Sequence, residues 1–228
     1  KVYGAGHILS SDRMGTEASV ASITPDDLKA YYKKYITPIA AFMTIAGDVN
    51  MARVRAALDP LQKTWIGDPV AEPEFVLPAP VSAPELVFVD VPGAKQSVIN
   101  IGCLGLTRTD PDYFPATVMN HKLGGSFNSN VNLVLREQKG YTYGARTGFG
   151  GSSFLPGTFT AGASVRSSAT LESVQIFKDL MERYPTELSE EDLLFTKNSL
   201  TKSFARQFET LGAKQGMLSD IGAYNLPL

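Results

Sequence analysis

The ten residues LREQKGYTYG, from Leu135 to Gly144, decide how the middle of this sequence folds. Gly140 is the type of residue that commonly follows the last turn of a helix. The residues before it fit a helical pattern, and residues 142–149 alternate large and small side chains as a strand does. The segment therefore predicts a helix that ends at Gly140 and a strand that follows directly.

The segments on both sides of these ten residues predict the fold class. The expected order is two strands (85–90 and 97–106), two helices (110–123 and 129–138), a hairpin of two strands (142–149 and 158–165) and two helices (169–184 and 189–208). This order does not alternate strictly, as a parallel doubly wound sheet would. It predicts an α+β fold, a two-layer sandwich in which helices cover one face of an antiparallel-rich sheet.

Residues 1–66 are predicted to be the C-terminal part of a first αβ domain. Thr24 can cap a helix, Pro25 suits its first position, and Asp26 favours the positive end of the helix dipole. Residues 41–46 are a short apolar run that predicts a buried strand. Residues 51–65 repeat apolar side chains at helical spacing and predict a second helix.

A proline-spaced segment follows this first part. Because proline disfavours helix interiors, residues 67–84 are expected to form a mostly extended linker. The second αβ domain is then expected to span residues 85–228 and to be truncated at its C-terminus. The prolines of the linker are Pro69, Pro73, Pro78, Pro80 and Pro84.

Composition excludes several classes of protein. The 228 residues include 21 basic and 23 acidic side chains, mixed along the chain, with a formal net charge of -2. This balance argues against a nucleic-acid partner, and no apolar run approaches the ~20 residues of a membrane-spanning helix. Cys103 lies in an apolar run and is predicted to be a buried, inert thiol. Since the sequence opens on Lys1 rather than Met, we expect it to be part of a longer protein.

The two histidines, His7 and His121, form no recognisable metal-binding motif. They are far apart in the sequence, no His-x-x-x-His pair exists, and no cysteine cluster accompanies them. No metal ligands and no cofactor are therefore predicted in this chain. A serine hydrolase that uses Ser126 or Ser129 stays open, and it requires His121 within hydrogen-bond reach of the serine.

The helix-to-strand segment also carries a candidate pair of hydrogen-bond donors. Arg136 falls in the last helical turn and Tyr143 near the start of the strand. A guanidinium and a phenol at one site suit a carbonyl oxygen that gains negative charge during the reaction. The structural alternative is that Arg136 complements the helix C-terminus and Tyr143 packs in the sheet.

Several segments together carry a resemblance to a known family. The segments in the second half are Gly124–Phe127, Asn132–Leu135, Arg136–Ala145, Leu188–Leu193 and Tyr224–Pro227, and those in the first half are Ile23–Leu28, Tyr35–Pro38 and Ile45–Val49. In order and spacing they resemble the second domain, and the end of the first, of one half of an M16 (pitrilysin/insulinase-like) zinc peptidase. The resemblance covers nearly the whole chain.

The resemblance implies a fold and a division of labour. In the family two αβ domains form each half, and two halves close around a peptide or protein substrate. One half holds zinc through an inverted His-x-x-Glu-His helix and a distal Glu, and the facing half supplies an Arg and a Tyr seven residues apart. Arg136 and Tyr143 match that pair and are implied to stabilise the reacting carbonyl. Tyr141 is the competing tyrosine, and with Gly124 and Gly125 it is expected on the substrate-binding surface.

This sequence departs from the family's pattern because it lacks His-x-x-Glu-His. Zinc is therefore expected in the parent protein or in a partner M16 half, fused or separate, and the chain alone is expected to be inactive. The alternative function is a non-catalytic scaffold like the core subunits of respiratory complexes, which share the fold. The resemblance also suggests the periplasm or cell envelope of a bacterium.

Overall fold

The computed structural model describes residues 1–71, 74–79, 81 and 83–226, which group into two compact units. The sheet unit comprises residues 1–5 and 77–203, and the helical unit comprises residues 6–76 and 204–228. The units therefore separate between Val76 and Leu77, within the segment expected as a linker. Pro73 and Pro80 of that segment, and Pro227 of the family-like C-terminal segment, lie outside the described residues.

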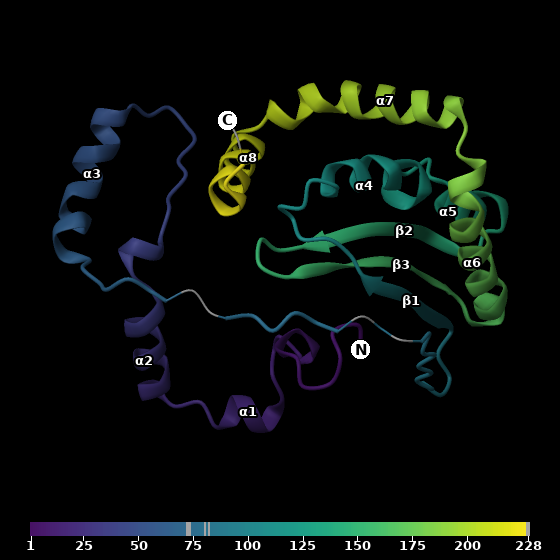
Figure 1. Ribbon diagram of the computed structural model, residues 1–228, viewed down its shortest axis with the longest axis horizontal. Coiled ribbons are helices and arrows are strands. Elements are labelled where there is room, and N and C mark those ends of the chain that lie inside the picture. Colours follow the sequence, from purple (N-terminus) through teal and green to yellow (C-terminus); the bar gives the residue numbers. More distant parts are fainter. Residues whose placement is uncertain (72–73, 80, 82, 227–228) are drawn as a thin grey trace. The chain divides into compact units, whose positions relative to one another are not determined.

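The sheet unit is built on three antiparallel strands in the order β1-β3-β2 (Figure 1). The strands are β1 (Gln96–Leu104), β2 (Thr142–Gly151) and β3 (Pro156–Arg166), and the predicted hairpin of β2 and β3 is confirmed. In the register, Ile99 of β1 is opposite Ala163 of β3, which is opposite Ala145 of β2. All three side chains are buried, so one face of the sheet forms the core.

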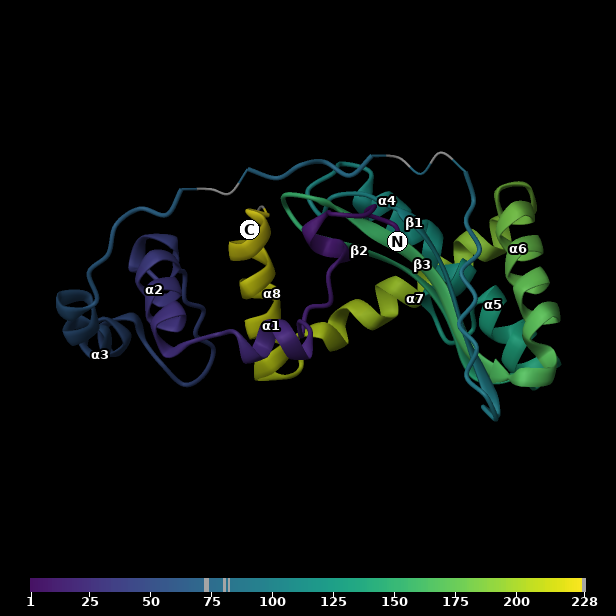
Figure 2. The ribbon, with the colours of Figure 1, turned by 90° about the horizontal axis from the view of Figure 1, so that it is seen from below.

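Helical segments cover this core face (Figures 1 and 2). Val131, Leu135 and Phe177 are fully buried in one cluster with the inward side chains of the strands. A helix-covered antiparallel sheet is what the sequence predicted, and the α+β fold class is confirmed. The helical segments of this unit are α4 (Tyr113–Asn120), η3 (His121–Gly125), α5 (Asn130–Asn132), η4 (Leu133–Gln138), η5 (Ser167–Ala169), α6 (Thr170–Glu187) and α7 (Glu190–Phe204).

Two of these segments, η3 and η4, are π-helical turns. They take up the ends of the helices predicted at 110–123 and 129–138, so each of those predictions holds in extent but not in helix type. At the end of η4 the Lys139 N–H donates to the Val134 carbonyl, a bond across five residues. Gly140 follows with φ +63°, and the Tyr141 N–H bonds back to the Leu135 carbonyl. The predicted helix stop at Gly140 is confirmed.

The helical unit contains helices whose starts are set by local capping. In α2 (Pro25–Tyr35) the Thr24 side chain accepts from the Asp27 N–H, and the Asp27 carboxylate accepts from the Thr24 N–H. This reciprocal capping confirms the predicted helix start. The second predicted helix is also confirmed, whereas α8 was not predicted. The remaining helical segments are η1 (Ile8–Ser10), α1 (Glu17–Ala21), η2 (Pro38–Ala40), α3 (Met51–Thr64), η6 (Ala205–Phe208) and α8 (Leu211–Tyr224).

Two predicted strands, at 41–46 and 85–90, are wrong. Neither segment is hydrogen-bonded into the sheet that the described residues form. A strand exists only where a neighbouring strand pairs with it, so an apolar run alone is not sufficient. In the second segment the side chains of Leu86, Val87, Phe88 and Val89 are 53–92% exposed.

Cys103 is exposed, so the prediction of a buried thiol is also wrong. It lies on the same face of β1 as Ile99 and Ile101, whose side chains pack in or against the core. The core therefore covers the early part of β1 but not its end. Among the described helices, none has both the length and the apolar character needed to cross a lipid bilayer.

Candidate functional site

Arg136 is held in place by two neighbours within the sheet unit. The centre of its guanidinium lies 4.5 Å from the ring centroid of Phe127, a cation–π contact. Its Nη1 atom lies 3.5 Å from a carboxylate oxygen of Glu137. Nη1 itself is buried and makes no hydrogen bond. Because the side chain keeps a third of its surface exposed, the guanidinium could still reach a ligand.

Tyr143 projects away from the protein near the start of β2. It is 93% exposed, the highest value among the large exposed hydrophobic side chains that the structure describes. Regular alternation would place Tyr143 and Ala145 on the same face of the sheet, yet Ala145 is buried. An irregularity in the pairing of β2 with β3 between Thr142 and Ala145 accounts for the difference, because such a bulge re-aims a side chain. The structural alternative, in which Tyr143 packs in the sheet, does not apply.

Asn132 connects the segments that carry Arg136 and Tyr143. Its Nδ2 donates to the Phe127 carbonyl at 2.7 Å, and its Oδ1 accepts from the Ala145 N–H at 3.0 Å. Among the described residues no hydrogen bond or ion pair joins Arg136 directly to Tyr143, so this link is indirect. Sequence reasoning assigned no role to Asn132 or Phe127. A signal existed, since asparagine is a poor residue for a helix interior unless its side chain has another partner.

Tyr141, the competing tyrosine, has its hydroxyl committed to another residue. The hydroxyl donates to Glu172 on α6 at 2.6 Å, and Lys139 donates to the same carboxylate at 2.7 Å. The hydrogen bond from Lys139, and to a lesser extent that from Tyr141, holds the pKa of Glu172 below its usual value. The Arg166 guanidinium lies 4.7 Å from the Tyr141 ring. Tyr143 is therefore the tyrosine with a hydroxyl available to a ligand.

Gly124 and Gly125, predicted to bind substrate, lie in the π-helical turn η3. A Cβ atom on Gly124 would approach the Thr147 backbone nitrogen to 2.4 Å, so only glycine allows η3 to approach β2 this closely. On Gly125 a Cβ atom would lie 3.0 Å from the Asn120 amide. Gly124 is buried and Gly125 is exposed. The geometry gives Gly124 a packing role, and the substrate-binding role of both glycines stays a prediction.

His121 does not face either candidate serine. Its Nε2 lies 2.9 Å from Ser199 Oγ on α7, whereas the Ser126 and Ser129 hydroxyls are buried without a hydrogen-bond partner. Burial lowers the pKa of His121. The serine hydrolase required a contact between His121 and one of those serines, so this alternative is rejected.

The side chains that the structure describes do not fit a zinc ion. The described residues contain no group of three or more His, Cys, Asp or Glu that could hold a metal. His7 Nε2 lies 3.0 Å from the Val76 carbonyl within the helical unit, and its Nδ1 accepts from the Leu9 N–H. His121 belongs to the sheet unit and bonds to Ser199. A catalytic zinc needs about three converging protein ligands, which these residues do not provide.

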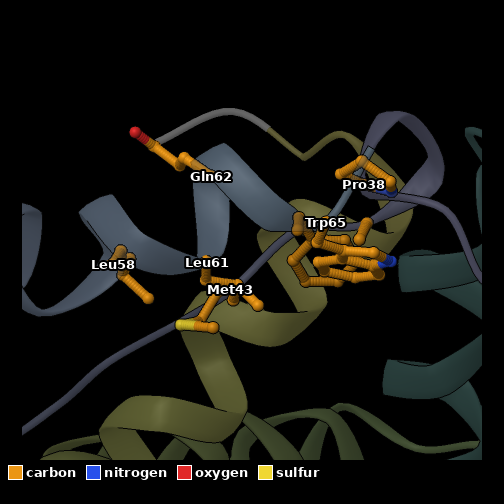
Figure 3. Close-up of a pocket in the computed structure, with 8 residues that line it drawn as sticks. Pro38, Met43, Leu58, Leu61, Gln62 and Trp65 are labelled. Carbon is orange, nitrogen blue, oxygen red and sulfur yellow. The ribbon is translucent and has the colours of Figure 1, made fainter. Parts of the chain in front are cut away.

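The helical unit contains an apolar cavity of about 270 Å³ (Figure 3). Met43, Leu61 and Trp65 point towards one another there, and Gln62 points away. None of its lining side chains is ionisable, so the cavity offers no acid, base or nucleophile. The lining residues are Pro38, Ala41, Phe42, Met43, Leu58, Leu61, Gln62 and Trp65.

Known proteins resemble the chain over most of its length. Residues 22–200 match the family model described as the peptidase M16 inactive domain. An uncharacterized zinc protease of Streptomyces coelicolor is 27% identical over 175 residues, which cover 74% of this chain and 38% of that protein. The chain thus spans well under half of this relative.

Two solved structures share the fold. The peptidase M16 inactive domain from Pseudomonas fluorescens superposes with a TM-score of 0.80 at 24% identity, over 93% of this chain and 50% of that one. A chain of complex III2 from Candida albicans superposes with a TM-score of 0.73 at 14% identity, over 98% of this chain and 55% of that one. At these identities the likeness establishes the fold alone.

Proposed function

This chain belongs to the peptidase M16 family, and on that premise we propose that it supplies the substrate-binding, carbonyl-stabilising side of a zinc peptidase. Arg136 and Tyr143 are the donors, and the substrate is a peptide or protein. The observation that carries the proposal is the exposed phenol of Tyr143 beside a helix end that holds Arg136, while the Tyr141 hydroxyl is bonded to Glu172.

We place the zinc elsewhere, in the rest of the parent protein or in a second M16 half. The donor set described above does not fit the metal, so no step of the reaction is assigned to zinc within this chain. What these residues contribute is charge and hydrogen bonding. The permanent positive charge of Arg136 and the O–H of Tyr143 would hold the scissile carbonyl and favour negative charge on its oxygen.

The test is Tyr143→Phe in the parent enzyme. Losing one donor to a developing oxyanion costs about 3 kcal/mol, so kcat should fall about a hundredfold while KM changes little. Tyr141→Phe is the matched control, and it should have the smaller effect because its hydroxyl bonds to Glu172. Unchanged turnover in Tyr143→Phe would reject the assignment. The isolated chain should contain no stoichiometric zinc and cleave no peptide, which metal analysis and a cleavage assay would check.

A second candidate function is a non-catalytic assembly subunit. Its support is the exposed apolar run at Leu86–Val89, together with the fold shared with a chain of the Candida complex. A run of this kind suits a protein–protein interface. If this function is the correct one, Arg136→Ala and Tyr143→Phe should leave assembly with the partner intact, whereas Phe88→Asp should weaken it in a co-purification assay.

A further inference from the structure

We infer that Asn132 is a positioning residue: it holds the side chains of Arg136 and Tyr143 in the orientation in which both can bind the scissile carbonyl. This inference rests on the proposed function, because it explains how two donors that do not contact each other keep fixed relative positions. Asn132 is 4% exposed and cannot itself touch a substrate. Its side chain acts through the two backbone groups that it holds, one on Phe127, whose ring supports Arg136, and one on β2, which carries Tyr143.

The first of these groups is the Phe127 carbonyl, 2.7 Å from Asn132 Nδ2. Phe127 is 56% exposed, so little packing holds its ring. The ring nevertheless supports the Arg136 guanidinium at 4.5 Å. Fixing the backbone of Phe127 therefore fixes the surface on which Arg136 rests. The Glu137 carboxylate forms an ion pair with the same guanidinium, 3.5 Å from its Nη1 atom.

The second group is the Ala145 N–H, 3.0 Å from Asn132 Oδ1. Ala145 is where regular pairing with β3 resumes after the irregularity that begins at Thr142. That irregularity turns Tyr143 outward while Ala145 faces the core. By holding Ala145, Asn132 fixes the end of the bulge and hence the direction of the Tyr143 side chain.

The chain offers a matched control in Asn120. This residue is 5% exposed, and it too bonds to β2, with Nδ2 3.0 Å from the Thr147 carbonyl and Oδ1 accepting from the Thr147 hydroxyl. Removing either amide removes two hydrogen bonds of a buried side chain, so both variants should lose stability. Asn120 holds neither Phe127 nor Ala145. Only Asn132→Ala should therefore disturb the two donors.

The first test is kinetic and uses the parent enzyme. Asn132→Ala should lower kcat of the folded enzyme by about tenfold to a hundredfold with little change in KM, since small misplacements have effects of that size. Its effect should be clearly smaller in a Tyr143→Phe background, because the part that acts through Tyr143 is already lost there and only the part that acts through Arg136 remains. Asn120→Ala should leave kcat near the starting value. Equal losses in the two asparagine variants, or full additivity with Tyr143→Phe, would overturn the inference.

The second test needs no catalysis and uses the chain itself. In NMR spectra with labelled tyrosine and arginine, Asn132→Ala should shift the Tyr143 ring and Arg136 Nε signals, and Asn120→Ala should not. If those signals stay unchanged in Asn132→Ala, Asn132 does not position the pair. If they shift but Tyr143→Phe retains full turnover in the parent, the positioning stands and the proposed function fails.

Discussion

The sheet unit and the helical unit differ in how far they bury their apolar side chains. In the sheet unit, side chains from all three strands and from the covering helices form one buried cluster. In the helical unit, Thr37 is the one buried residue among those described, while Leu28, Tyr31 and Phe42 are largely exposed. The described helices of the helical unit thus have local caps but bury few side chains, whereas the sheet unit is held together by long-range packing.

The largest effect expected from this difference concerns matched phenylalanines. Phe177 on α6 is fully buried, so Phe177→Ala should lower the free energy of unfolding by about 3–5 kcal/mol. Phe42 in the helical unit is 58% exposed, and Phe42→Ala should cost below about 1 kcal/mol. Chemical denaturation followed by circular dichroism would measure both values. Similar losses would mean that the helical unit buries Phe42 in solution.

A smaller effect, of opposite sign in the two units, is expected for glycine. Gly124→Ala in the sheet unit forces a methyl group against Thr147 and should destabilise by about 1–3 kcal/mol. Gly216 lies inside α8, where a Cβ atom would meet nothing within 4 Å. Gly216→Ala should therefore stabilise by about 0.5–1 kcal/mol. Thermal denaturation of the two variants would compare them, and a stabilised Gly124→Ala would contradict the close approach of η3 to β2.

The smallest effect concerns pH and the contact between His121 and α7. Burial holds the His121 pKa in the folded chain below its ordinary value of 6.5. As pH falls below about 6.5, the unfolded chain takes up the proton first, so folding stability should decrease towards pH 5. His121→Gln removes the titrating group and should lose less stability over this range. Urea denaturation at pH 7 and pH 5 would test this, and equal losses would exclude His121 as a source.

The helices were largely predictable because their signals are local. Thr24, Pro25 and Asp27 identify the start of α2, and Gly140 identifies the end of η4. The sequence did not predict α8, whose apolar residues do not gather on one face. The π-helical turns were also missed, since apolar spacing indicates a helix but not which carbonyl each N–H selects.

The strands and the site were predictable only in part. The hairpin of β2 and β3 was found because its partners are neighbours in sequence. The strands predicted at residues 41–46 and 85–90 were wrong because an apolar pattern does not show whether a pairing strand is present. Arg136 and Tyr143 were singled out as a donor pair in the helix-to-strand segment, and a family motif then favoured their functional role. Asn132 and Phe127 gained a role only once the contacts were known. No sequence pattern predicts a hydrogen bond between residues 132 and 145, which are 13 positions apart.

The π-helical turn η4 has a consequence for insertions and deletions at the site. A turn closed across five residues holds one residue more than an ordinary α-helical turn. Deleting a residue there would let the segment relax into a regular α-helix, so the chain should still fold. Side chains inside the turn, Arg136 among them, would then change direction, while those outside it would keep their faces. Arg136 would no longer lie over Phe127. A variant that is intact in a folding assay would therefore have lost the contact that holds this side chain at the site.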